Sequence, residues 1–133
     1  MLNLSQTANI LQSLLNQSSD RQEELFEEIV PEFQDKLIDK FEKYDLYLAM
    51  SYSFSRHGLE ISHIVLPKIH RNKGIGTKIM TEICKFSDEN KMDIYLSPTE
   101  IDGTSTDVLI KFYKKFGFRF LNGSKFMIRY FNQ

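Results

Sequence analysis

The segment Arg71-Asn72-Lys73-Gly74-Ile75-Gly76 joins an extended apolar run, residues 61–66, to a helical pattern over residues 77–90. A strand that passes through glycines into a helix builds an anion site, because the first N–H groups of a helix have no intrahelical partner and lie at the positive end of its dipole. Glycine also lets the main chain approach the ligand closely. The segment therefore predicts a strand–turn–helix unit that binds the pyrophosphate of a larger cofactor. The residues expected to contact it are Arg71, Asn72, Lys73, Gly74, Ile75, Gly76 and Thr77.

Two familiar phosphate loops do not fit this segment. A Walker loop has Gly-Lys followed by Ser or Thr, whereas here Gly76 is followed by Thr77 and then Lys78. A dinucleotide fingerprint needs a third glycine, and position 79 is isoleucine. The alternatives that remain are a different cofactor loop and an ordinary turn that binds nothing.

Composition restricts the class of protein. A chain of 133 residues supports one domain, and 41% hydrophobic with 26% charged residues is typical of a globular protein. A net charge of −1 gives no general attraction to nucleic acid or a membrane surface, and no apolar run is long enough to span a membrane. The lone Cys84 favours a reducing compartment, so we expect a cytoplasmic protein. No spaced Cys/His set indicates a metal site.

Residues 1–45 have the apolar spacing of helices. We expect one helix over residues 4–16, a break at residues 16–20 with Ser19 or Asp20 as the next cap, and a second helix that Pro31 ends or restarts. A further helical stretch follows over residues 33–44. The N-terminal third of the chain is therefore predicted to be a series of short helices.

Residues 46–131 alternate strands with helices. Residues 46–54 and 59–66 read as an antiparallel hairpin, and residues 92–96 as a short buried strand beside the second of these. A helix over residues 106–116 is stopped by Gly117 in the manner of a left-handed cap. A last hairpin over residues 118–131 turns at Asn122-Gly123.

The run Leu-Ile-Lys-Phe-Tyr-Lys-Lys-Phe-Gly-Phe over residues 109–118, together with Arg-x-x-Gly-x-Gly at residues 71–76, resembles the Gcn5-related N-acetyltransferase (GNAT) family. The resemblance covers residues 46–131. It implies an α/β (α+β) fold, with a mixed, mostly antiparallel sheet flanked by helices. Residues 1–133 then form a single domain, in which the helical segment 1–45 is atypical of the family and 46–131 is the cofactor-binding core. The implied reaction moves the acetyl group of acetyl-CoA to an amine of a protein or a small molecule.

The resemblance also assigns roles to individual residues. Glu60 lies eleven residues before Arg71, the spacing of the glutamate that takes the amine proton in histone-type members. A base is needed because an ammonium has no lone pair with which to attack a thioester. His63 is the alternative base, since histidine titrates near neutral pH, and water alone is another.

Tyr113 matches the family tyrosine that protonates the departing thiolate. The alternative is that Tyr113 is a core residue packed beside Phe112 and Phe116. Leu66, at the end of the splayed strand before the loop, is the expected main-chain contact of the cofactor. Thr106 stands where many members have an asparagine that touches the pantetheine arm. Threonine is shorter, so this contact departs from the family pattern.

A second class of function is a non-catalytic coenzyme A-binding or protein-interaction module on the same scaffold. The helical residues 1–45 motivate it, because the cofactor does not explain them. Their acidic cluster suits a basic partner or a solvated face. Self-association through these helices or the last hairpin is a further alternative, so a homodimer stays open. The acidic residues are Glu23, Glu24, Glu27 and Glu28.

Overall fold

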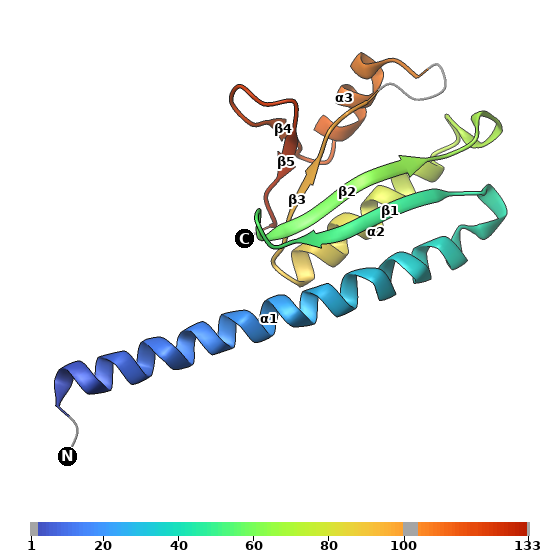
Figure 1. Cartoon of the computed structure of the whole chain (residues 1–133). Coiled ribbons are helices and arrows are strands. Elements are labelled where there is room, and N and C mark those ends of the chain that lie inside the picture. The colour runs from blue at the N-terminus through green and yellow to red at the C-terminus, as the bar shows by residue number, and fades with distance from the viewer. Residues whose placement is uncertain (1–2, 100–103, 133) are drawn as a thin grey trace.

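The computed structural model describes residues 3–99 and 104–132, with the main chain alone over residues 12–20. Figure 1 shows a small sheet with one long helix running past it. In chain order the elements are α1 (Leu4–Lys40), η1 (Glu42–Tyr44), β1 (Tyr47–Ser53), β2 (Gly58–Val65), η2 (Lys68–His70), α2 (Ile75–Glu89), β3 (Asp93–Leu96), α3 (Thr106–Lys114), β4 (Arg119–Phe120) and β5 (Met127–Arg129).

The sheet has five strands in the order β1-β2-β3-β5-β4. β2 and β3 run parallel, and the pairs β1–β2, β3–β5 and β4–β5 run antiparallel. The parallel pair needs a crossover connection, and α2 provides it. The predicted fold class, a mixed and mostly antiparallel sheet flanked by helices, is confirmed.

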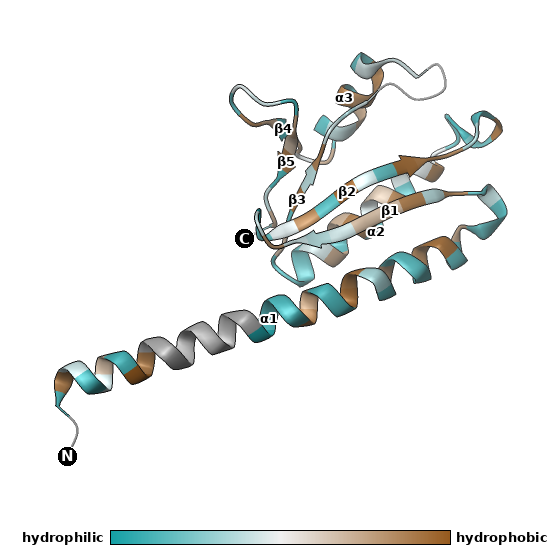
Figure 2. Cartoon of the chain, in the orientation of Figure 1, coloured by the Kyte–Doolittle hydropathy of each residue, from teal (hydrophilic) through white to brown (hydrophobic). Residues whose placement is uncertain are grey.

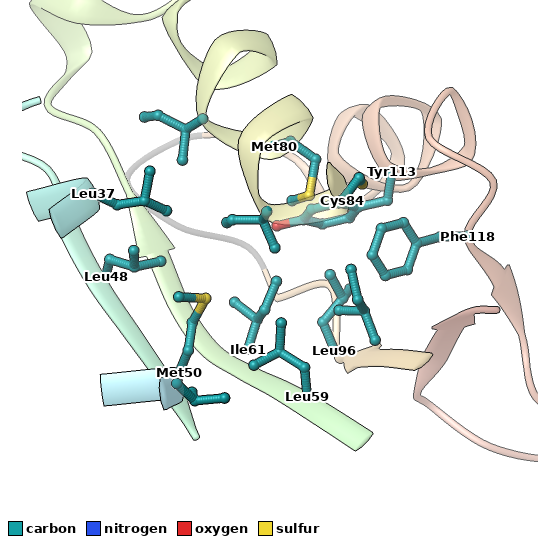
Figure 3. Packing of buried hydrophobic residues seen from close by; sticks show 14 of the residues in the cluster. Leu37, Leu48, Met50, Leu59, Ile61, Met80, Cys84, Leu96, Tyr113 and Phe118 are labelled. Carbon is teal, nitrogen blue, oxygen red and sulfur yellow. The ribbon is translucent and has the colours of Figure 1, made fainter. Parts of the chain in front are cut away.

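The core lies between one face of the sheet and the helices α1 and α2. Side chains alternate along a strand, so Leu48, Leu59 and Ile94 all point to this face, where they join Val30 of α1 and Ile83 of α2 in one buried cluster. Figure 3 shows part of this packing. The two helices also contact each other, since the rings of Phe33 and Phe86 stack with centroids 4.0 Å apart. The opposite face of the sheet is more polar.

The N-terminal third differs from the prediction, because it is one helix of 37 residues instead of a series. The predicted break at residues 16–20 and the caps at Ser19 or Asp20 are wrong, as the helix is capped by Asn3, which forms a capping box with Gln6. Pro31 lies inside the helix and is exposed. The buried residues Val30 and Leu37, on either side of it, hold the helix against the sheet. Such packing outweighs the local cost of a proline.

The later elements agree with the prediction. Gly117 has φ 93° and ends the turn after α3, and the Phe118 N–H donates to the Tyr113 carbonyl at 3.3 Å, as in a Schellman cap. The last hairpin pairs β4 with β5, and the Ser124 N–H donates to the Leu121 carbonyl across the turn. Within the described residues, no helix is both long and apolar enough to cross a membrane.

The outer edge of β1 is covered by α1. The Met50 N–H donates to Oε1 of Gln34 at 2.6 Å, so a helix side chain takes the place of a neighbouring strand. Gln34→Ala is expected to lower the free energy of unfolding by about 1–2 kcal/mol, since it leaves a partly buried donor unsatisfied. Urea unfolding measures this, with Gln22→Ala on an exposed part of the same helix as control. Equal stability of both variants would contradict the assignment.

Candidate functional site

The loop between η2 and α2 has the conformation of an anion site. Asn72 and Gly74 have left-handed φ values of 59° and 82°. Gly74 is the N-cap of α2, and no side chain caps the helix. The first intrahelical bond joins the Lys78 N–H to the Gly74 carbonyl at 3.1 Å. The N–H groups of residues 75–77 thus have no partner within the helix and lie at the positive end of its dipole.

Arg71 fixes the loop to its surroundings. Its Nε donates to the Leu66 carbonyl at 2.8 Å, and its Nη1 donates to Oγ1 of Thr104 at 3.0 Å. The first contact closes the turn back onto the end of β2, and the second ties it to the segment before α3. Arg71 therefore holds both walls of the site together, besides adding positive charge.

A cleft of about 560 Å³ opens at this loop. The start of α2 forms one wall, the end of β2 a second and α3 a third. Among the predicted contacts, Leu66, Arg71, Asn72, Gly74, Gly76 and Thr77 line the cleft, whereas Lys73, Ile75 and Thr106 do not. The lining also includes Ile64, Val65, Ile79, Thr104, Ser105, Val108, Leu109, Phe112, Tyr113 and Lys115.

β2 separates from β3 beside the cleft. Their pairing runs from Gly58 opposite Asp93 to Ile61 opposite Leu96 and stops there, although β2 continues to Val65. The register with β1 shifts at the same point, because Met50 pairs with Ile61 and Ala49 with His63. Ser62 is thus the extra residue of a β-bulge in β2. Beyond the bulge, the side of β2 that faced β3 has no strand partner, and its main-chain groups border a wedge.

A second cavity of about 200 Å³ lies in this wedge. Its lining mixes apolar with hydroxyl and imidazole side chains. Ile64 and Tyr113 line both cavities, so these residues mark the junction between the cleft and the wedge. The other residues that line it are Ile61, Ser62, His63, Leu96, Ser97 and Thr99.

Tyr113 is buried at this junction, with 6% of its surface exposed. Figure 3 shows it between Met80 and Cys84 of α2 and the ring of Phe118. Burial raises the pKa of Tyr113 to about 12. The phenol is therefore a neutral hydrogen-bond donor at any pH at which the protein would work.

Of the two candidate bases, one lines the wedge and the other does not. Glu60 is half-buried on the helix-free face of the sheet, paired with Ser51 and Tyr95, and lines neither cavity. His63 is exposed just past the bulge, lines the smaller cavity and lies 5.4 Å from Tyr47, measured between ring centroids. The structure thus brings His63, and not Glu60, into the wedge with Tyr113.

Comparison with known proteins gives the chain a family. The sequence model of the acetyltransferase (GNAT) domain matches residues 41–120, which is more than half of the chain. The chain belongs to the GNAT family. Since the match begins just after α1, the whole of the long helix lies outside the matched residues.

A solved structure shares the GNAT fold. The anti-CRISPR protein AcrVA5 superposes with a TM-score of 0.54 at 20% identity, over 62% of this chain and 87% of that one. At this identity the likeness concerns the fold alone. No curated protein matches the sequence.

In the part of the chain that the structure describes, no group of three or more His, Cys, Asp or Glu side chains is placed to hold a metal ion. Cys84 is buried in the core, and burial raises the pKa of its thiol to about 11. Such a thiol is a poor nucleophile at neutral pH. Cys84 is therefore a residue of the core.

Two features of this GNAT site were missing from the sequence prediction, the bulge at Ser62 and the hydroxyl of Thr104. The bulge at Ser62 has no local signal, because it depends on the register of two strands. Thr104 and Ser105 line the cleft directly before α3. Ser105 is the N-cap of that helix, and its side chain accepts a hydrogen bond from the Val108 N–H.

Proposed function

We propose that this protein is an acetyl-CoA-dependent N-acetyltransferase in which an amine attacks the thioester directly. The observation that carries the proposal is the continuous path from the uncapped start of α2, along the end of β2, to the wedge at Tyr113. An anion site, a run of unpaired strand edge and a buried proton donor lie in that order along it. Bound acetyl-CoA would supply a thioester carbonyl and a thiolate leaving group.

The groups that line the cleft suit acetyl-CoA, the proposed acetyl donor. The N–H groups of Ile75, Gly76 and Thr77 would hold the pyrophosphate, and the main chain of residues 64–66 would hold the arm and the carbonyl oxygen. Leu66 remains our proposed main-chain contact. Preorganised N–H donors aimed at an oxygen that gains charge stabilise the transition state. Lys73 and Lys115, near the mouth, would add positive charge, and Thr106 is a weaker candidate than its neighbours Thr104 and Ser105.

The reaction needs two proton transfers, and the chain has groups for both. The amine nitrogen bonds to the carbonyl carbon as the carbon–sulfur bond breaks. A base takes the proton of the amine, and Tyr113 donates its O–H to the departing sulfur. The acceptor amine would enter from the smaller cavity, which lies on the far side of Tyr113 from the phosphate loop. We propose His63 or, through water, Glu60 as the base.

Paired variants separate these bases. Because His63 lines the wedge, His63→Gln is expected to lower kcat/KM about 100-fold and Glu60→Gln about 10-fold. His57→Gln, in an exposed turn, is the matched control and should keep the full rate. The measurement is kcat/KM against pH, where loss of the base removes the acidic limb of the profile. The opposite order of losses would assign the base to Glu60, and full rates in both variants would leave water as the base.

The function itself is tested by thiol release. Purified protein is given acetyl-CoA with a panel of acceptors that includes lysine peptides, N-terminal peptides and polyamines. We expect coenzyme A release that depends on at least one acceptor. Mass spectrometry should then show about 42 Da added to that acceptor, because an acetyl group replaces one hydrogen when the amide forms.

A second candidate function is a coenzyme A-binding interaction module without transfer. The observation that favours it is α1, since this helix lies wholly outside the residues that match the family and its N-terminal part extends beyond the sheet. Coenzyme A binding with no acetylated product across the panel would support it. An acetylated product that disappears in Tyr113→Phe would exclude it.

A further inference from the structure

Few buried side chains hold α3 against the rest of the cleft. Of the nine residues of this helix, all of them described, Tyr113 alone is buried. A methyl group added at Gly76 would lie 3.6 Å from Cζ of Phe112, so this ring meets the start of α2 at ordinary contact distance without interlocking. Figure 2 shows the end of β2, the neighbouring wall, in the brown of apolar residues. Apolar contacts are not directional, so they do not by themselves fix α3 against the phosphate loop, residues 71–76.

A polar link joins the start of α3 to the phosphate loop. Nη1 of Arg71 donates to Oγ1 of Thr104 at 3.0 Å, while Nε donates to the Leu66 carbonyl at 2.8 Å. Thr104 lies two residues before the first residue of α3, and the intervening Ser105 caps the helix. Leu66, Arg71 and Thr104 all line the cleft, and the last two are half-buried. One guanidinium therefore fixes three walls of the site relative to one another.

The geometry of these bonds separates the hydrogen-bonding role of Arg71 from its charge. Nε carries a single hydrogen, and the Leu66 carbonyl accepts it, so a two-point grip on a phosphate through Nε is not open while that bond stands. The anion site itself is built from main-chain N–H groups at the start of α2. A planar guanidinium can join two fixed oxygens, whereas the ammonium of lysine is a point charge on a flexible stem. Arg71→Lys thus keeps the charge and loses the link.

We propose that Arg71 and Thr104 are positioning residues, whose hydrogen bond couples the phosphate loop to the start of α3. The affinity for acetyl-CoA then depends on this bond and not on the charge of Arg71. The part that concerns acetyl-CoA rests on the proposed function, whereas the coupling within the chain does not. Because Tyr113 lies on α3, the same bond sets this tyrosine against the anion site.

Isothermal titration with acetyl-CoA tests the dependence. We expect Arg71→Lys and Thr104→Val each to raise the Kd about 10-fold, and Thr104→Ser, which keeps the hydroxyl, to bind as the wild type does. Arg21→Lys and Thr7→Val, at exposed positions of α1, are the matched controls and should leave the Kd unchanged. Wild-type affinity in Arg71→Lys would show that the charge suffices, and wild-type affinity in Thr104→Val would show that the hydroxyl does nothing for binding. Either result would overturn the proposal.

The double variant tests whether the two residues act as a unit. Thr104→Val is expected to raise the Kd about 10-fold in the wild-type chain and less than about 2-fold in the Arg71→Lys chain. Equal costs in the two chains would mean that Thr104 acts without Arg71 and would contradict the coupling.

Hydrogen exchange of the chain without ligand separates a failure of the coupling from a failure of the cofactor site. We expect the amide hydrogens of α3 to exchange about 10-fold faster in Arg71→Lys and in Thr104→Val than in the wild type, and at the wild-type rate in Thr104→Ser. Faster exchange, with no binding of acetyl-CoA by any of the proteins, would contradict the proposed function and support the coupling alone. Unchanged exchange in both variants would overturn the coupling.

Discussion

Tyr113→Phe is expected to lower kcat about 100-fold while leaving the affinity for acetyl-CoA nearly unchanged. The substitution removes one oxygen at the junction of the two cavities and keeps the ring that packs against Phe112 and Phe118. Without that O–H, the departing sulfur must leave as a bare thiolate or wait for a water proton. Coenzyme A release under saturating acceptor measures the change.

The pH profile distinguishes a proton donor from a phenolate. Burial raises the pKa of Tyr113 to about 12, so the phenol keeps its proton below that pH. The wild-type rate should therefore show no decline from ionisation of Tyr113 between about pH 7 and pH 10. Tyr130→Phe removes an exposed hydroxyl and serves as the control. A Tyr113→Phe protein with the full rate would make this tyrosine a core residue only.

Asp88→Asn is expected to destabilise the fold more than any other single change discussed for this chain. The Asp88 carboxylate accepts two bonds from Arg129, at 2.9 and 3.0 Å, and a third from the Asn132 N–H at 2.8 Å. Arg129 also donates its Nε to the Phe116 carbonyl at 2.8 Å, so the pair fastens the last strand to α2 and to the end of α3. We expect a loss of about 2–3 kcal/mol in the free energy of unfolding at pH 7.

The effect has a defined pH dependence. The hydrogen bonds from Arg129 hold the pKa of Asp88 below its usual range, ahead of the opposing effect of burial. A carboxyl with a lowered native pKa stabilises the fold above its unfolded pKa, about 3.9, and loses this contribution as the pH falls through the native value. The gap between wild type and Asp88→Asn should thus be full at pH 7 and shrink below about pH 4. Urea unfolding at several pH values measures it.

The control for Asp88→Asn is Glu89→Gln, the exposed neighbour on the same helix. Its effect is expected to stay within about 0.5 kcal/mol. A gap between wild type and Asp88→Asn that grows as the pH falls would contradict the assigned sign.

The parts of the site that were predicted from the sequence are those with local causes. The loop at residues 71–76 was recognisable because glycine, a helix start and a preceding strand are all encoded within a few residues. The hairpin from β1 to β2 followed from strict alternation, and the turn at Gly117 followed from its position after a helix. Each of these depends on neighbours in the chain.

The parts that were not predicted depend on contacts between distant residues. The continuity of α1 through Pro31 rests on packing of Val30 and Leu37 against the sheet. Local helix-breaking residues do not reveal this packing, because the partners are distant in the sequence. The bulge at Ser62 depends on how β2 pairs with β1, and it moves His63 into the wedge while Glu60 stays outside. The spacing to Arg71 alone favoured Glu60, because the number of residues between two positions does not say on which side of the strand a side chain lies.

The most direct test of the account is a thermal-shift titration with acetyl-CoA, with coenzyme A and ATP in parallel. Ligand that binds the native state raises the melting temperature, and a ligand at 100 times its Kd adds about 2.7 kcal/mol of stability. We predict a rise of several degrees with both coenzyme A compounds and a smaller one with ATP. No rise with either coenzyme A compound at millimolar concentration would show that the loop before α2 is only a turn and would contradict the proposed cofactor site.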